Sequence, residues 1–268
     1  MLNKIQYLLR SARSYQTVGQ RFSSGLSTKD VYEEYRPSED VIVMQAREGN
    51  KSIMRQFLKH TYLKNDPLLL ANGLNNDMDL LDYWLDEIQE HLSVLAVDKK
   101  SGKVIGVAAG SECTPESAEK SKELAARTIK NTNAFRVACL FADLPEKTQL
   151  FERFRIQNMF EVNMIGTHPD YRQQGLAKYM LLHLRALARR TGYPLLRIDC
   201  TSHFSARIAL KQGMEKFSER KVNEYKDQDK KPWVAIIPPP PHSNFVVCFE
   251  RLDPTLATFF KKPPLNSK

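Results

Sequence analysis

A single domain of mixed α/β architecture is the fold class that the sequence predicts. In the middle of the chain, apolar runs typical of strands alternate with amphipathic helical patterns. At both ends, successive apolar runs are expected to pair as antiparallel strands. No internal repeat is present in the 268 residues. We therefore expect one domain over residues 40–252, preceded by a leader (1–29) and followed by a C-terminal tail (253–268).

The first half of the domain is expected to begin with a strand and continue mainly as helices. In order, we expect a strand at 40–46, a helix from 50 towards 67, a second helix at 78–92, a hairpin at 93–112 and mostly helical structure at 115–157. Asn50 is the expected N-cap of the first helix and Pro67 its expected end, while Pro145 marks a break in the last segment.

The second half predicts strands and helices in alternation, closed by a strand pair. In order, we expect a strand at 160–166, a helix from 175 to about 190, a strand at 194–200, a short helix at 205–212 and strands at 214–226 and 244–252. Gly192 is a natural end for the longer helix and Gly213 for the shorter one.

The formal net charge of +9 is concentrated at the N-terminus. Residues 1–29 contribute five positive charges and no acid, so the remainder carries about +4. This Arg- and Ser-rich segment, with Leu and Ile at helical spacing and the sequence RFSS near residue 22, is typical of a mitochondrial transit peptide. The alternatives are a disordered basic tail and an amphipathic helix on a membrane surface. The chain contains no apolar run of about 18 residues, so no membrane-spanning helix is expected.

The four cysteines are scattered and form no CxxC pair. Neither a zinc site nor a disulfide framework is indicated, and buried reduced thiols are expected at Cys113, Cys139, Cys200 and Cys248. Cys200 ends a predicted strand, which leaves a catalytic cysteine as the less favoured alternative to core packing. No metal ligand set is expected.

The segment GTHPDYRQQGLAKYML (166–181) joins a predicted strand to a predicted helix through a basic loop. A helix start presents unpaired N–H groups and partial positive charge, and a glycine there lets a phosphate approach the backbone. The sequence thus predicts an anion site, with an ordinary connecting loop as the alternative. The motifs GxxxxGK[ST] and GxGxxG are absent, which excludes the common nucleotide loops.

In this segment, Arg172-x-x-Gly175-x-Ala177 after a strand resembles the acetyl-CoA signature of the GCN5-related N-acetyltransferases (GNAT), a family with a central splayed sheet flanked by helices. The segment CTSHFSARIALKQGMEKF (200–217) resembles the next strand, helix and turn of that family. With LKNDPL, SHFSAR and PPPPH in matching order, the chain is similar to insect arylalkylamine (dopamine-type) N-acetyltransferases. The resemblance covers residues 41–252 and is strongest from residue 160 onward.

The resemblance implies direct acetyl transfer from acetyl-CoA to a small primary amine, with no metal. A backbone N–H near Ile165 would stabilise the oxyanion, the splayed strand would bind the pantetheine arm, and the loop and helix start would bind the pyrophosphate. The implied cofactor-binding residues are Met164, Ile165, Gly166, Thr167, Arg172, Gln173, Gln174, Gly175, Leu176, Ala177 and Lys178.

Three residues are implied to move protons. Asp66, where the family typically has Glu, is the expected general base, acting through water because its side chain is shorter. Its alternative role is that of a turn residue before Pro67. Thr201 and Ser205 stand where the family has serines assigned to a proton relay, although Ser205 could instead cap the helix that follows.

The family's acid toward the leaving thiolate is often a tyrosine, and this chain has Phe204 at that place. His203 is a candidate for the vacant role, with a structural histidine as the alternative. His242 is expected to line the amine pocket, or else to lie in a surface loop. His168 and His183 are interpreted as loop and helix residues.

Three other functions remain open at this point. Peptide or protein N-acetylation would need an open groove, whereas the aromatic content favours a closed arylamine pocket. A catalytically inactive acyl-CoA-binding protein and a basic nucleic-acid-binding module are further alternatives. The last is disfavoured because the excess charge lies in the leader, so we expect no nucleic-acid partner. We also expect a monomer.

Overall fold

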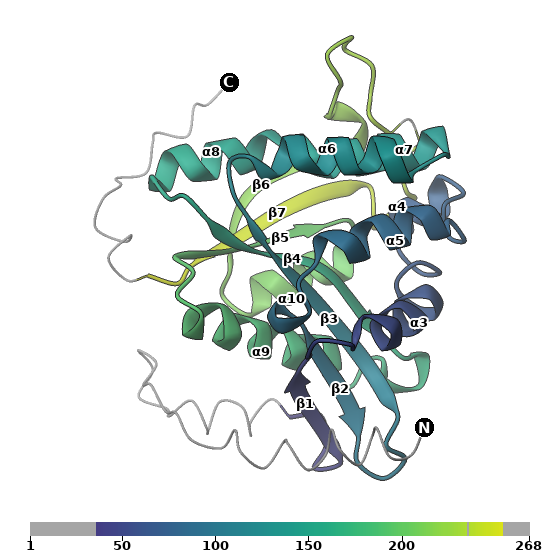
Figure 1. Ribbon diagram of the computed structural model, residues 1–268, viewed down its shortest axis with the longest axis vertical. Helices are drawn as coiled ribbons and strands as arrows, with labels where there is room; N and C mark the ends of the chain where they lie inside the picture. Colours follow the sequence, from purple (N-terminus) through teal and green to yellow (C-terminus); the bar gives the residue numbers. More distant parts are fainter. Residues whose placement is uncertain (1–35, 235, 254–268) are drawn as a thin grey trace.

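A seven-stranded sheet runs through the molecule in the order β1-β2-β3-β4-β5-β7-β6 (Figure 1). The computed structural model describes residues 36–234 and 236–253, so the predicted leader and all but the first residue of the predicted tail lie outside the described residues. Neighbouring strands are antiparallel except β4 and β5, which are parallel. The strands are β1 (Val41–Gln45), β2 (Val94–Asp98), β3 (Val104–Cys113), β4 (Met159–Thr167), β5 (Leu195–Cys200), β6 (Glu215–Lys221) and β7 (Asn244–Arg251). The predicted mixed α/β domain is confirmed.

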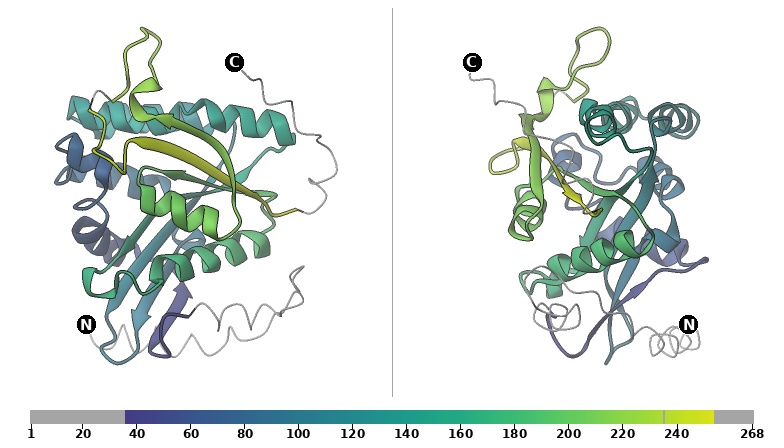
Figure 2. Two further views of the ribbon diagram at one scale, coloured as in Figure 1. Left: turned by 180° about the vertical axis from the view of Figure 1, so that it is seen from behind. Right: turned by 90° about the vertical axis from the view of Figure 1, so that its left-hand side faces the viewer.

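The helices form two layers, one on each face of the sheet. They are α3 (Lys51–Thr61), α4 (Pro67–Ala71), α5 (Met78–Glu87), α6 (Ser117–Thr128), α7 (Thr132–Ala142), α8 (Pro145–Phe154), α9 (Leu176–Arg190) and α10 (His203–Lys211), with short 3-10 turns η2 (Glu90–Leu92), η3 (Pro169–Tyr171) and η4 (Val222–Glu224). The side view in Figure 2 shows the green helices α9 and α10 apart from the teal helices α6–α8, with strands between them.

Each face of the sheet has its own apolar core, as the alternation of side chains along strands requires. Leu196, Ile198 and Cys200 of β5 point to the face covered by α9 and α10. On the opposite face, Met164 of β4 and residues of β3 and β7 pack against α3–α7. A third cluster packs α8 against the starts of β4 and β5. The two faces therefore meet only through the sheet.

Helix ends follow local sequence signals, with three differences from expectation. Asn50 occupies the N-cap position of α3, but its side chain accepts from Arg47 N rather than from the helix. Pro67 does not end that helix, which stops at Thr61; it begins α4 instead, where its missing N–H costs nothing. The expected break at Pro145 is present, and a second one at Asn131 separates α6 from α7 because Asn131 caps α7.

Within residues 36–234 and 236–253, no helix combines the length and apolar character needed to cross a bilayer.

Candidate active site

Strands β4 and β5 separate partway along their length. They pair in parallel only at Phe160–Leu196, Glu161–Arg197 and Val162–Ile198. The separation follows directly on a β-bulge in β4: Gly110 of β3 pairs with Val162 and Ala109 with Met164, which leaves Asn163 without a partner on β3. A bulge bends its strand, so the sheet opens into a gap beyond Asn163.

The register of β4 determines which backbone groups face this gap. His168 donates its backbone N–H to β3 at 2.9 Å. Hydrogen-bonded pairs alternate along an antiparallel ladder, so Gly166 and Met164 continue the bonded series with β3. Ile165 and Thr167 then direct their N–H and C=O groups to the opposite edge. Of the four strand residues predicted to bind the cofactor, these two offer backbone groups to the gap.

Close packing between α3 and β4 requires a glycine at position 166. A Cβ atom built on Gly166 would lie 2.6 Å from Thr61 Oγ1 and 3.2 Å from Leu58 Cδ2, so any other side chain would push α3 away from β4. The glycine therefore lets α3 approach β4 next to the gap.

The predicted anion loop lies between β4 and α9, on the α9 face of the sheet (Figure 1). Gly175 occupies the N-cap position with a left-handed φ of 82°, and no side chain caps this helix start within the described chain. Gln173 also has a positive φ, of 62°. Arg172, Gln173, Gln174 and Gly175 are exposed, Ala177 and Lys178 are partly buried, and Leu176 is buried in the core beneath. The arrangement offers backbone N–H groups and the positive end of a 15-residue helix to an anion.

Asp66 and Thr201 are brought together although they lie far apart in sequence. Thr201 Oγ1 donates to Asp66 Oδ2 at 2.5 Å. Asp66 Oδ1 accepts from Leu68 N at 3.0 Å and Leu69 N at 3.1 Å and so caps α4. Asp66 is buried, and this burial raises the pKa of its carboxyl group, although the bonds from Thr201 and the two amides oppose the shift.

Tyr62 connects this pair to the end of β5. Burial raises the pKa of the Tyr62 hydroxyl well above its usual range, and the electrostatic influence of Asp66, Cys200 and Asp199 acts in the same direction. The hydroxyl is therefore protonated at neutral pH, and it lies among the carboxyl groups of Asp66 and Asp199.

Ser205 lies apart from the Asp66–Thr201 pair. Its Oγ donates to Ser202 O at 2.9 Å and lies 3.0 Å from Ser202 Oγ. The cap of α10 is Ser202, whose Oγ accepts from Ser205 N at 3.1 Å. The alternative that Ser205 caps this helix is therefore wrong, because the helix begins two residues earlier, at His203.

His203, Phe204 and His242 form an exposed aromatic group at the start of α10. His203 N donates to His242 Nδ1 at 3.2 Å, and the rings of Phe204 and His242 meet edge to face at 5.3 Å. His242 lines a narrow crevice with Thr201 and Leu68, and a positive charge on His242 would lower the pKa of Asp66. His242 thus lies near the Asp66–Thr201 pair, whereas the Phe204 side chain is 61% exposed.

A cavity of about 310 Å³ opens on the face of the sheet opposite α9. Helices α5–α8 and strands β3–β5 surround it, and it reaches the point where β4 and β5 separate. Four aromatic side chains line it: Tyr62, Tyr83, Trp84 and Phe141. Trp84 meets Tyr62 at 6.1 Å and Phe141 at 5.9 Å, both edge to face. The cavity therefore has an aromatic wall of the size and shape that suits a small ring.

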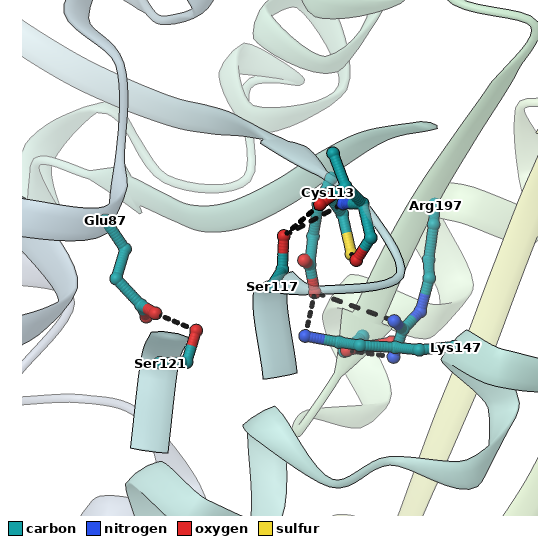
Figure 3. A network of polar contacts seen from close by, with 9 residues as sticks. Glu87, Cys113, Ser117, Ser121, Lys147 and Arg197 are labelled. Carbon is teal, nitrogen blue, oxygen red and sulfur yellow. Dashed lines mark hydrogen bonds and ion pairs between the residues drawn. The ribbon is translucent and has the colours of Figure 1, made fainter. Parts of the chain in front are cut away.

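The floor of the cavity is a buried charge network (Figure 3). Lys147 Nζ of α8 lies 3.1 Å from Glu161 Oε1 of β4, and Arg197 Nη1 of β5 lies 3.7 Å from the same atom. Arg197 Nη2 also donates to Asp199 Oδ2 at 2.5 Å. Arg197 is fully buried, so its charge depends on these carboxylates.

Glu87 and Ser121 form the other side of this polar site, across from Lys147 and Arg197 (Figure 3). Ser121 Oγ donates to Glu87 Oε1. Burial raises the pKa of the Glu87 carboxyl group. Hydrogen bonds from Ser121 and Tyr83 and the positive charge of Lys147 oppose this shift. The cavity thus carries carboxyl groups on both sides of this polar site, from Glu87 on one side and from Glu161 and Asp199 on the other.

Asn163, Arg197 and Asp199 were not identified from the sequence as site residues. A signal was present: FEVNMIG places an acid and an amide two residues apart in a mostly apolar strand, and RIDC places two charges on one face of a buried strand, since side chains two apart share a face. Lys147 carries no comparable signal, because a lysine on a helix is ordinarily solvated.

The cysteines are buried and unpaired by disulfides, as expected. Among residues 36–234 and 236–253, no group of three or more His, Cys, Asp or Glu side chains is placed to hold a metal ion.

Comparison with known proteins identifies the fold. The profile of the acetyltransferase (GNAT) family matches residues 62–214. Among solved structures, mosquito arylalkylamine N-acetyltransferase-like 5b superimposes with a TM-score of 0.70 at 22% identity, over 79% of this chain and 99% of that chain. Arylalkylamine N-acetyltransferase 2 from Aedes aegypti gives 0.67 at 20% identity, over 80% and 100%. A polyamine N-acetyltransferase from Drosophila melanogaster gives 0.65 at 18%, over 79% and 100%.

Proposed function

The chain belongs to the acetyltransferase (GNAT) family, and from that membership we propose that it transfers the acetyl group of acetyl-CoA directly to a small primary amine, with an arylalkylamine as the favoured acceptor. One observation carries this proposal: the aromatic cavity on one face of the sheet is lined by Val162, Asn163 and Asp199, at the point where the β4–β5 pairing ends, and the anion loop lies on the other face. Donor and acceptor can then approach from opposite faces and meet in the gap.

On the donor side, the pyrophosphate of acetyl-CoA would rest on the start of α9. Gly175 gives close access to the backbone there, and the exposed side chains of Arg172, Gln173 and Gln174 add donors. The pantetheine arm would extend β4 along the backbone of Ile165 and Thr167. The N–H of Ile165 would polarise the thioester carbonyl and stabilise the oxyanion as the tetrahedral intermediate forms.

On the acceptor side, the amine must lose a proton before its nitrogen can attack the thioester carbon. Both oxygens of Asp66 are engaged, one by α4 and the other by Thr201. A proton would therefore reach Asp66 through the Thr201 hydroxyl, which can accept one proton while it donates another. Burial supports this role, because an Asp66 carboxyl with a raised pKa holds a proton closer to neutral pH.

After attack, the C–S bond breaks and the CoA thiolate takes up a proton. Phe204 has none to give, and the rings of His203 and His242 both lie against its ring. His203 is the proposed donor, and His242, beside Thr201, is proposed to line the acceptor side. Ser205 forms hydrogen bonds with Ser202 and none with Asp66 or Thr201 in the described chain, so its predicted relay role would require a bridging water.

The aromatic wall of the cavity supports an arylalkylamine. Tyr62, Trp84 and Phe141 offer edges and faces to a ring of similar size. The two arylalkylamine N-acetyltransferases from mosquitoes that share the fold are consistent with this acceptor class.

A second acceptor class is supported by Glu87. Its carboxyl group at the far side of the cavity could accept hydrogen bonds from a second cationic group, as in a diamine or a guanidino amine. The Drosophila polyamine N-acetyltransferase shares the fold. Glu87→Gln would separate the two classes, because it should weaken diamines far more than arylalkylamines.

The proposed function is tested by calorimetric titration with acetyl-CoA, followed by thiol release with tyramine, dopamine, tryptamine, agmatine, putrescine and a peptide. We expect acetyl-CoA binding and turnover with small amines. Absence of acetyl-CoA binding at high micromolar protein would refute the proposal. Binding without turnover would favour an inactive acyl-CoA-binding protein, and turnover of the peptide alone would favour peptide N-acetylation.

We also propose that residues 1–29 direct the protein to mitochondria and that the enzyme acts as a monomer. The composition of the leader supports the first of these. Sequencing the N-terminus of the mature protein tests import, since an intact Met1 would contradict cleavage near residue 22. Light scattering coupled to size-exclusion chromatography gives the oligomeric state.

A further inference from the structure

Asn163 and Asp199 occupy equivalent places at the apex of the gap. The last parallel pair between β4 and β5 is Val162–Ile198. Asn163 and Asp199 are the next residue on each strand, and both line the cavity. They lie at the point where the two strands begin to part.

Each of these residues presents a buried acceptor atom with nothing to accept from. Within the described chain, Asn163 Oδ1 and Asp199 Oδ1 have no hydrogen-bond partner, and both atoms are shielded from solvent. The Asp199 side chain is only 5% exposed. A buried acceptor without a donor is costly, and most such atoms in proteins are paired. Two of them on facing strands indicate a ligand that brings its own donors.

The direction of Asp199 is fixed by its neighbour. Arg197 Nη2 holds Asp199 Oδ2 at 2.5 Å, which leaves Oδ1 as the oxygen without a donor on a residue that lines the cavity. Arg197 is rigid because it is fully buried and also faces Glu161. The open oxygen is therefore held in place before any ligand arrives, and binding costs little reorganisation.

The charge around the cavity favours a cation. Glu87, Glu112, Glu161 and Asp199 line it against Lys120 and Lys147. With Arg197 included, the acids still exceed the bases by one. In a site of reduced dielectric this excess attracts a positive ligand group.

We infer that Asp199 Oδ1 and Asn163 Oδ1 together bind the ammonium group of the acceptor amine at the apex of the β4–β5 gap. The inference rests on the proposed function and makes Asp199 the residue that selects a primary ammonium over a neutral group. The nitrogen is then held on the cavity side of the sheet, two residues along β4 from the backbone N–H of Ile165. Tyr62 lines the same cavity, and the charges of both Asp199 and Asp66 act on its hydroxyl group.

The test compares Asp199→Asn and Asn163→Ala with Asp82→Asn. Asp82 is a matched control, because it also pairs with an arginine, Arg55, but on an exposed surface away from the cavity. Calorimetry gives the Kd for acetyl-CoA, and thiol release gives kcat and KM for phenethylamine. We expect Asp199→Asn to raise the KM for the amine about 10- to 100-fold with acetyl-CoA affinity unchanged. Asn163→Ala, which alters no charge, should raise the KM about 3- to 10-fold, and Asp82→Asn should match the wild type.

A pair of isosteric ligands makes the readout independent of turnover. Phenethylamine and 2-phenylethanol differ only in the ammonium group, and quenching of Trp84 fluorescence in the cavity reports the binding of either one. The wild type should prefer the amine strongly, and Asp199→Asn should lose that preference while still binding the alcohol. If the wild type acetylates amines, and Asp199→Asn and Asn163→Ala have the same KM for the amine and the same preference for amine over alcohol as the wild type, this inference is overturned and the proposed function stands. A wild type that binds acetyl-CoA but neither binds nor acetylates any amine would overturn it together with the proposed function.

Discussion

Asp66 and Thr201 lie 135 positions apart in the sequence and share a hydrogen bond of 2.5 Å. The bond joins the start of α4 to the residue that follows β5, at the open end of the gap. Asp66 uses its other oxygen to cap α4. One carboxyl group thus combines a structural task with the proposed chemical one, and a simple truncation would confuse the two.

Asp66→Ala and Asp66→Asn separate these tasks. The amide of Asn can still accept from Leu68 N and Leu69 N, whereas Ala cannot. We expect Asp66→Ala to lower the free energy of unfolding by about 1 kcal/mol through loss of the cap and Asp66→Asn to change it much less. Both should lower kcat by about 100-fold or more through loss of the proton acceptor, with acetyl-CoA affinity unchanged. Urea denaturation and thiol-release kinetics measure the two effects.

Asp77→Ala is the matched control for the cap. Asp77 caps α5 by accepting from Leu80 N at 2.9 Å and lies outside the site. It should cost about the same 1 kcal/mol with kcat unchanged. Retention of full kcat by Asp66→Asn would show that Asp66 serves only as a cap.

Gly175→Ala tests the anion site at the start of α9. The residue has φ of 82°, and a Cβ atom there would meet nothing within 4 Å. The folding cost is therefore backbone strain alone, about 1–2 kcal/mol. The added methyl group would stand where the pyrophosphate approaches, so we expect the Kd for acetyl-CoA to rise about tenfold or more. Calorimetry and thermal unfolding give the two quantities.

Gly192→Ala is the control, because it introduces the same backbone strain at a position away from the proposed acetyl-CoA site. Gly192 follows the other end of α9 with φ of 83° and equally open space. It should lose similar stability and bind acetyl-CoA like the wild type. If both variants lose the same affinity for acetyl-CoA, the loss is due to reduced helix stability, and the result would contradict a phosphate site at Gly175.

The elements of this fold could be predicted because each follows a local pattern. The strand at 160–166 and the helix after Gly175 follow from periodicity and glycine placement, and both are present. The gap between β4 and β5 could be expected only through the family resemblance, because a bulge at Asn163 depends on register with β3. The Asp66–Thr201 bond and the Lys147–Glu161 ion pair depend on how α4 and α8 pack against the sheet, which no local pattern records.

Arg197 tests the cost of the buried network. Arg197→Met keeps the volume and removes the charge that faces Glu161 and Asp199. Because the carboxylates remain buried with one cation fewer, we expect the free energy of unfolding to fall by about 3–5 kcal/mol. Urea denaturation measures it. Arg55→Met, which breaks the exposed pair with Asp82, should cost about 0–1 kcal/mol. A similar small cost in both variants would contradict the view that the network is an isolated charge cluster.

The pH dependence of amine binding follows from Asp199. Burial raises the pKa of its carboxyl group to about 6, although Arg197 and Lys147 oppose the shift and Glu161 adds to it. The charge of Asp199 also acts on Tyr62 and Cys200, and both stay neutral in this range because burial raises the pKa of the Tyr62 hydroxyl and hydrogen bonding to Cys248 raises that of the Cys200 thiol. A primary ammonium keeps its charge between pH 5 and 8. We therefore expect the Kd for phenethylamine to be constant above about pH 7 and to rise as the pH falls through about 6, where Asp199 becomes neutral.

The measurement is amine Kd from Trp84 fluorescence between pH 4.5 and 8, without acetyl-CoA. Burial also raises the pKa of Asp66, but Asp66 acts on the proton only after the amine is bound. A binding measurement therefore reports the titration of Asp199 and not that of Asp66. In Asp199→Asn the inflection should vanish and the affinity should stay at the weak level that the wild type reaches at low pH. An inflection near pH 6 that survives in Asp199→Asn would assign the titration to another group and would contradict an ammonium site at Asp199.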